Sequence, residues 1–412
     1  MSNGWTGGQY SIFRYIFGVY LLVHFVHLLP WAAEMFSSSG VLPDAALSPF
    51  YGVFPNLLFF ADSPLAATLF VGSAAVASIL FMIGRFDRIA AVWIWYVLAC
   101  VFTRNPLTLN PSLPYVGWLM LVHAAIPLAP YGSLAAKNRV DPDGGWKLAP
   151  SLFGAAWILM AVGYSYSGYM KLSSVSWVDG TALEQVMNNP LARDLFTRDL
   201  MLALPPIFLK LLTWGSLGLE LLFAPLALSK RLRPWLWISM VGMHIGILST
   251  VHFADLTLGM LVLHVFTFDP AWIKPKFAGR KDFVFFDGEC GLCHSAVRTI
   301  LAEDREGGFS LSPLQGDLFK SKVDDTTRTS LPDSIVVLTE DGKLLLESDA
   351  VLYVMSRFGG LWRAISFASG IVPKSLRDFG YRCVAKVRKS IFKKPEGMCP
   401  LMPRHLAERF AY

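Results

Sequence analysis

The sequence has little charge and few cysteines for its length. Only 16% of its 412 residues are Asp, Glu, Lys or Arg, whereas 54% are hydrophobic, and this balance excludes a protein that is soluble throughout. Five cysteines are present, and Cys290 and Cys293 form the only Cys-x-x-Cys. A zinc site of this type needs a second such pair, so its absence makes zinc binding the weaker interpretation and leaves no metal site predicted.

The apolar residues are concentrated in the first two thirds of the chain. Runs that approach membrane-spanning length lie near 10–33, 64–84, 88–103, 113–131, 151–171, 206–228, 232–250 and 254–269. The first run is too long for a cleavable signal peptide and lacks a small-residue cleavage site, so we expect it to remain as a helix. We therefore predict a polytopic α-helical membrane domain of about eight helices over residues 1–272, followed by an α/β domain over residues 280–412.

Lysine and arginine are distributed unevenly between the short loops. Loops 85–88, 137–147 and 230–233 are rich in them, whereas the alternate loops hold few. With eight spans, the basic loops and both termini fall on one side, which the positive-inside rule places in the cytoplasm. We expect a bacterial inner-membrane protein whose N-terminus and C-terminal domain are cytoplasmic. A disulfide in that reducing compartment would be transient and catalytic.

The Cys-x-x-Cys follows a short aromatic run, Phe283–Phe286, that is typical of a buried strand. The run ends in Asp287-Gly288, and the segment after the cysteines has helical character. A helix N-terminus stabilises a thiolate, so Cys290 is the predicted nucleophile, and Cys293, one turn later, can resolve a mixed disulfide.

The C-terminal region also has an element order that fits a thioredoxin-like sheet with flanking helices. We expect strands at 283–287, 309–313, 334–339 and 344–347. The expected helices lie at 292–304, 316–330 and 349–358, with further helix beyond.

Several separated blocks between residues 283 and 405 resemble the DCC family of thiol-disulfide oxidoreductases. These blocks are "FVFFDGECGLCHSAVRTIL", "LSPLQGD", "DSIVVLTEDGKLLLESDAVL" and "LRDFGYRCVAKVRKSIF…GMCPL". The resemblance implies that Cys290 attacks and Cys293 resolves, with a thiol or disulfide protein of unknown identity as partner. Asp287, the aspartate of the family motif, would relay a proton or simply cap the turn. Cys399 would shuttle a disulfide or be inert.

Residues 374–394 form a basic stretch with interleaved apolar side chains. They hold eight Lys or Arg residues and one acidic residue, Asp378. In a chain anchored in a bilayer, such a stretch favours membrane lipids of the anionic inner leaflet over nucleic acid as its partner. The alternative is a solvated basic face without a partner.

Ionisable side chains inside the apolar runs are costly and need an explanation. They are His24, His27, His123, Lys171, Lys210, Glu220, His244 and His264. No second pair matches the spacing of His24 and His27, so we interpret the histidines as hydrogen-bonded packing residues rather than haem or metal ligands. Glu220 lies deep in its run and is harder to explain as packing.

The segment "YSYSGYMKLSSVSWVDG", residues 164–180, resembles the "AGxKKL…DW" region of the vitamin K-dependent γ-carboxylases and of the wider horizontally transferred transmembrane domain (HTTM) group. Met170 replaces one lysine of that pattern, and one residue is inserted before Trp177. The resemblance implies that Lys171 acts as a base on a hydroquinone and that His244 is a site residue. Burial disfavours the charged form of a lysine, which would suit such a base. The alternative is an interfacial lysine at a helix end.

Three hypotheses follow. The first is a membrane redox enzyme that exchanges thiols and disulfides through Cys290 and Cys293, with a quinone or other lipid-soluble molecule bound near Lys171, Trp177, Glu220 and His244. The second is a carboxylase or epoxidase relative in which Lys171 acts on a hydroquinone cofactor. The third is a membrane anchor or binding module without catalytic activity.

Overall fold

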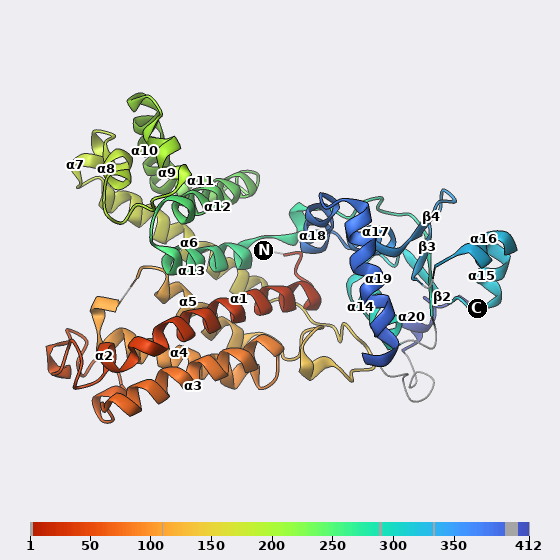
Figure 1. Cartoon of the computed structure of the whole chain (residues 1–412), viewed down its shortest axis with the longest axis horizontal. Helices are drawn as coiled ribbons and strands as arrows, with labels where there is room; N and C mark the ends of the chain where they lie inside the picture. Colours follow the sequence, from red (N-terminus) through yellow and green to blue (C-terminus); the bar gives the residue numbers. More distant parts are fainter. Residues whose placement is uncertain (1–2, 109, 288–290, 333, 392–402, 412) are drawn as a thin grey trace. The chain divides into compact units, whose positions relative to one another are not determined.

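The computed structural model describes residues 3–108, 110–287, 291–332, 334–391 and 403–411 (Figure 1). It divides the chain into two compact units. The first comprises Phe13–Leu128 and Ala149–Phe268, and the second comprises Ser2–Ile12, Ala129–Leu148 and Asp269–Tyr412. The second unit therefore includes two stretches from early in the sequence. The division at residues 272 and 280 that the sequence suggests stays a prediction.

The first unit is helical. Its helices are α1 (Gly7–Leu28, whose first residues belong to the second unit), α2 (Ala32–Phe36), α3 (Pro64–Ile83), α4 (Asp87–Arg104), α5 (Leu113–Ala125), α6 (Pro150–Lys171), α7 (Val175–Val178), α8 (Ala182–Met187), α9 (Phe196–Leu202), α10 (Pro206–Leu221), α11 (Phe223–Ala227), α12 (Arg233–Thr250) and α13 (Ala254–Thr267). Local signals set their ends. In α3, Ser63 accepts a hydrogen bond from the Ala66 amide at the start, and Gly84 ends the helix in the left-handed conformation with φ of 69°.

Seven of the eight apolar runs coincide with one helix each and the run near 206–228 with two, α10 and α11, but few of these helices are long and apolar enough to cross a bilayer. Among the described residues, Gly7–Phe36 and Pro64–Ile83 qualify, and a third span results if Phe196–Leu202 and Pro206–Leu221, bent by 107°, are joined. Helices α5 and α13 have 13 and 14 residues. At 1.5 Å per residue they are about 20 Å long, short of a hydrocarbon core of about 30 Å. Two candidate spans are thus established, whereas eight spans, and the topology derived from them, stay predictions.

The second unit contains a small mixed sheet with strand order β2-β1-β3-β4. Its strands are β1 (Asp282–Phe286), β2 (Phe309–Pro313), β3 (Val336–Leu338) and β4 (Leu344–Leu346). Strand β1 pairs parallel with β2 and antiparallel with β3, which is itself antiparallel to β4. All four strands occur where the sequence predicts them.

In the sequence of the second unit, helices lie between these strands and after the last of them. They are α14 (Gly291–Glu303), α15 (Asp317–Lys322), α16 (Asp325–Ser330), α17 (Glu347–Phe358), α18 (Gly360–Gly370), α19 (Lys374–Ile391) and α20 (Arg404–Ala407). The single helix predicted over 316–330 is in fact two. The break occurs because Asp324 adopts an extended conformation and caps α16 by accepting a hydrogen bond from the Thr327 amide.

The sheet has apolar residues on both faces. Alternate residues of β1 point to opposite sides, so Val284 and Phe286 join one buried cluster, while Phe285 joins another with Val336 and Phe319. The first cluster includes Val297 and Ile300 of α14. The helix that carries Cys293 is therefore fixed to the sheet by its apolar face.

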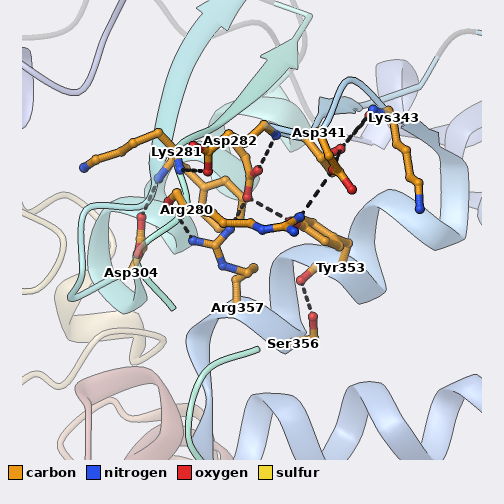
Figure 2. A network of polar contacts seen from close by, with 12 residues as sticks. Arg280, Lys281, Asp282, Asp304, Asp341, Lys343, Tyr353, Ser356 and Arg357 are labelled. Carbon is orange, nitrogen blue, oxygen red and sulfur yellow. Dashed lines mark hydrogen bonds and ion pairs between the residues drawn. The ribbon is translucent and has the colours of Figure 1, made fainter. Parts of the chain in front are cut away.

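A buried ion pair between Asp282 and Arg357 fixes the start of β1 (Figure 2). The second carboxylate contact of Asp282 comes from the Tyr353 hydroxyl, which donates a hydrogen bond of 3.0 Å. The Glu340 amide donates to the other carboxylate oxygen at 2.9 Å, and Arg357 also donates to the Arg280 carbonyl at 3.0 Å. The network joins β1, the β3–β4 turn and α17.

The far end of α14 is fixed by the two early stretches of the second unit. Glu303 is buried and accepts hydrogen bonds from the Thr6 hydroxyl at 2.5 Å, the Gly8 amide at 2.9 Å and the Trp362 indole at 2.5 Å. Arg298 donates to the Arg139 carbonyl at 2.7 Å. Burial raises the pKa of Glu303 above its ordinary value, and the hydrogen bonds from Thr6, Trp362 and Gly8 oppose that rise.

Candidate functional site

The predicted redox motif lies between the end of β1 and the start of α14. Strand β1 ends at Phe286, and α14 begins at Gly291, which places Cys293 in its first turn. Cys290, the side chain of Cys293 and Cys399 lie outside the part of the chain that the structure describes. The strand before the motif and the helix that begins within it are both present where the sequence predicts them. At the amino end of α14, exposed amide groups and the helix dipole favour a thiolate.

Asp287, the predicted aspartate of the motif, is buried directly after β1. The Gln315 side chain donates a hydrogen bond of 3.4 Å to its carboxylate. The preceding residue, Leu314, donates its amide to the Phe286 carbonyl at 2.9 Å, and the ring of His294 lies 6.3 Å from the ring of Phe286. Proton relay and capping both stay open as roles for Asp287.

Gln315 is a site residue that the sequence reasoning missed. It follows β2, which lies parallel to β1, and the carboxyl ends of parallel strands meet at one edge of a sheet. The sequence therefore contained a signal for Gln315, because it is a polar residue two positions after the predicted strand 309–313 and should lie at the edge where β1 ends.

The comparisons with known proteins concern this same region. Residues 284–394 match the family model described as DCC1-like thiol-disulfide oxidoreductase. The chain is 37% identical over 124 residues to "Uncharacterized protein YuxK" of Bacillus subtilis (strain 168). The matched region covers 28% of this chain and 85% of that protein. Through this region, the chain belongs to the DCC1-like thiol-disulfide oxidoreductase family.

A second relative comes from a plant. "DCC family protein At1g52590, chloroplastic" of Arabidopsis thaliana is 28% identical over 129 residues, which covers 30% of this chain and 75% of that protein. No solved structure matches. The family match does not extend to residues 1–283. None of these comparisons shows the resemblance to the carboxylase membrane region.

In the helical unit, the structure brings together three of the four predicted binding residues. The Lys171 ammonium donates to both carboxylate oxygens of Glu220 at 2.7 Å and lies 4.2 Å from the ring centroid of Trp177. A carboxylate and the face of an indole are partners suited to a charged ammonium ion. A role for Lys171 as a neutral base would therefore require its separation from Glu220.

The fourth residue, His244, makes a different contact. Its Nε2 lies 2.7 Å from the Tyr164 hydroxyl, which also lies 2.7 Å from Nε2 of His264. One hydroxyl has one proton to donate, so with neutral rings one imidazole accepts from Tyr164 and the other donates to it. Tyr164 stands seven residues before Lys171 and shares its face of α6. That spacing was the signal for Tyr164, which the sequence reasoning missed.

Close packing of α6 against α10 and α11 holds these side chains in place. Ser165 donates to the Leu221 carbonyl at 3.1 Å and accepts from the Ala224 amide at 2.9 Å. A Cβ atom at Gly168 would lie 2.5 Å from the Leu221 nitrogen, so only glycine permits this approach.

The remaining histidines that the structure pairs are bonded to carboxylates. His24 Nδ1 lies 2.7 Å from Asp255, and His123 Nε2 lies 3.3 Å from Asp87. These contacts agree with the interpretation as packing histidines. Among the described residues, no group of three or more His, Cys, Asp and Glu is arranged to hold a metal ion.

Proposed function

We propose that the protein is a membrane-associated thiol-disulfide oxidoreductase with Cys290 as nucleophile and Cys293 as resolving thiol. The observation that carries the proposal is the family match over 284–394, which includes both cysteines on a strand-to-helix connection. The order β2-β1-β3-β4, with one parallel pair and a terminal antiparallel hairpin, supports a thioredoxin-like arrangement. Two apolar helices support association with a membrane.

The proposed reaction is an exchange of two electrons between dithiol and disulfide. The Cys290 thiolate attacks one sulfur of a partner's disulfide, forms a mixed disulfide and releases the other sulfur as a thiolate. The Cys293 thiolate then attacks Cys290 and releases the second partner thiol. The partner is reduced by two electrons, and the Cys290–Cys293 pair is oxidised to a disulfide.

The test is reduction of a disulfide substrate by the pre-reduced full chain. We expect Cys290→Ser to abolish turnover and Cys293→Ser to accumulate the mixed disulfide, which non-reducing electrophoresis detects. Cys383→Ser is the matched control, because Cys383 is an exposed cysteine outside the motif, and it should retain wild-type turnover. Full turnover by Cys290→Ser would refute the proposal.

The cytoplasmic placement of the redox domain is part of the same proposal, and it has its own test. In intact cells, a membrane-permeant maleimide should label Cys290 and Cys293, whereas an impermeant maleimide should not. The labelling that disappears in the double variant Cys290→Ser/Cys293→Ser reports these two thiols. Labelling by the impermeant reagent would show that the domain faces outward and that the helix number behind the topology is wrong.

As a second candidate function, we propose that the helical unit binds a quinone or another lipid-soluble molecule near Lys171 and His244. The specific observation is the grouping of Lys171, Glu220 and Trp177 from α6, α10 and α7. Tyr164, on the same helix as Lys171, contacts His244 of α12. A charged lysine can bind a carbonyl oxygen, and it can act as a base only after losing its proton to another group.

Two variants of Lys171 distinguish these roles. Lys171→Arg preserves the charge, the ion pair and the contact with an indole face, whereas Lys171→Met removes them. For a base, both variants should abolish quinol oxidation by the purified chain. For a binding residue, Lys171→Arg should retain affinity in a quinone titration and Lys171→Met should weaken it. Unchanged titrations and turnover for both would exclude a quinone site at Lys171.

A further inference from the structure

Helices α18 and α19 display an exposed apolar surface on the second unit. The exposed fractions are 77% for Phe367, 75% for Ile371, 61% for Phe379 and 60% for Leu376. A single exposed apolar side chain is ordinary, but four large ones on two successive helices and the short connection between them, where Ile371 lies, are not. We call this set, Phe367, Ile371, Leu376 and Phe379, the apolar face.

The part of the apolar face on α19, Leu376 and Phe379, lies opposite the side of that helix that packs on the domain. Asp378 accepts a hydrogen bond of 3.3 Å from the Ser348 amide, and the Tyr381 hydroxyl accepts one of 3.0 Å from the Ile335 amide. At 100° per residue, Leu376, Phe379 and Cys383 share the other side of the helix. The helix thus uses polar groups for its inward contacts and leaves apolar groups outside, the reverse of a helix on a soluble protein.

Cations border this face. Arg382 and Lys386 are exposed on α19, and residues 374–394 hold eight Lys or Arg against one Asp. Lys374 and Arg377 form ion pairs with Asp349 on the packed side of α19. Arg382 and Lys386 are therefore the exposed cations next to the apolar face in the described part of this helix. Arg382 also lies 3.6 Å from Glu347.

We propose that the apolar face is a docking surface for an anionic lipid bilayer. Apolar and aromatic side chains bordered by Lys and Arg suit the boundary between acyl chains and anionic headgroups. A second copy of the chain is disfavoured as occupant, because pairing two such faces would bring like-charged borders together. The two candidate spans would hold this domain near a bilayer and lower the entropic cost of docking. The proposal is independent of the redox activity.

Cys383 provides a reporter, because it is exposed and lies on the same side of α19 as Phe379. The full chain carrying Cys290→Ser, Cys293→Ser and Cys399→Ser is placed in phosphatidylcholine nanodiscs, with or without phosphatidylglycerol, and treated with an impermeant maleimide. Cys100 is buried in this background. We expect Cys383 to react roughly tenfold more slowly in discs with phosphatidylglycerol than in detergent, because docking shields it.

Two variants and one control make the result specific. Phe367→Ser/Phe379→Ser should restore the detergent rate in anionic discs by removing apolar contact. Arg382→Gln/Lys386→Gln should restore it by removing the border charges. Lys320→Gln/Lys322→Gln removes two exposed cations on α15 and should leave protection unchanged. Each rate is expressed relative to the same variant in detergent, which corrects for changes in the reactivity of the thiol itself.

Three outcomes would overturn the proposal. Equal rates in anionic discs and detergent would show that the face does not dock. Equal protection in discs of phosphatidylcholine alone would show that anionic lipid is not recognised. Protection in detergent that increases with protein concentration would assign the face to a second copy.

Discussion

At the scale of single residues, Glu303 illustrates how burial and hydrogen bonding oppose each other. Its carboxylate accepts three hydrogen bonds, which favour ionisation, yet burial is the largest influence and raises its pKa. A carboxyl whose folded pKa is raised stabilises the fold at pH below its unfolded pKa. That stabilisation is lost as pH rises through the folded pKa.

We therefore predict that the full chain loses stability as pH rises above about 4.5, the ordinary pKa of a glutamate, until the folded pKa of Glu303 is passed. In Glu303→Gln this part of the pH dependence should disappear. Thermal unfolding of the detergent-solubilised chain across that range measures it. Glu306→Gln is the control, because Glu306 is exposed in the same segment and should behave like wild type. An unchanged pH profile in Glu303→Gln would contradict the prediction.

A second prediction at this scale concerns the buried pair of Asp282 and Arg357. Arg357→Met leaves the Asp282 charge buried with the Tyr353 hydroxyl and the Glu340 amide as its side-chain and backbone donors among the described residues. We expect a loss of about 3–5 kcal/mol in the free energy of unfolding. Lys320→Met, which removes an exposed partner of Asp317, should change it by less than about 1 kcal/mol. Denaturant unfolding measures the free energy of unfolding of both variants. Similar losses in the two would show that other groups stabilise the buried Asp282 charge when Arg357 is removed.

At the scale of elements, glycine decides how closely two helices approach. A Cβ at Gly168 of α6 would meet the Leu221 nitrogen at 2.5 Å, whereas nothing lies within 4 Å of a Cβ at Gly154 on the same helix. An alanine at each position therefore distinguishes the cost of disturbing close helix packing from the gain in helix propensity.

Gly168→Ala should destabilise the helical unit by about 1–3 kcal/mol because α6 and α10 must move apart. Gly154→Ala should stabilise it by up to about 1 kcal/mol through helix propensity. In chains that also carry Cys290→Ser, Cys293→Ser, Cys383→Ser and Cys399→Ser, reaction of Cys100, buried in α4 of the same unit, with a thiol dye during heating reports unfolding. If both variants shifted the midpoint equally, the close approach at Gly168 would carry no energetic weight.

Element identity itself was well predicted by the sequence. A short apolar run rich in aromatic residues, Phe283–Phe286, located β1, because such a run is a local property of the sequence. The break between α15 and α16 was missed, because it depends on Asp324 capping a helix in the middle of a polar stretch. Whether the shorter helices cross a membrane stays a prediction, because α5 and α13 have only 13 and 14 residues and helix length is set by where each helix ends in the fold.

At the scale of the whole molecule, the redox domain is completed by stretches far away in sequence. Within the second unit, Thr6 and Gly8 bond Glu303, Tyr131 bonds Thr299 at 2.8 Å, and Arg139 accepts from Arg298. The C-terminal half of α14 therefore depends on residues 2–12 and 129–148.

We predict that a fragment of residues 269–412 exchanges the amide hydrogens of 298–304 faster than the full chain does. The loss of these partners leaves buried donors and acceptors unsatisfied. Amides between β1 and β2, whose partners lie within 282–313, are the internal control and should remain the better protected. Equal exchange at 298–304 in fragment and full chain would show that the early stretches are dispensable.

The sequence by itself determined the features that depend on neighbours along the chain. These are the apolar runs, the order of strands and helices, and the Cys-x-x-Cys at a helix start with its family resemblance. The tertiary structure decided which distant residues meet: Gln315 at Asp287, Glu220 and Trp177 at Lys171, Tyr164 between His244 and His264, and Thr6 at Glu303. The physical reason is that periodicity and capping are local, whereas ion pairs and buried hydrogen bonds form only after packing brings distant side chains within about 3 Å.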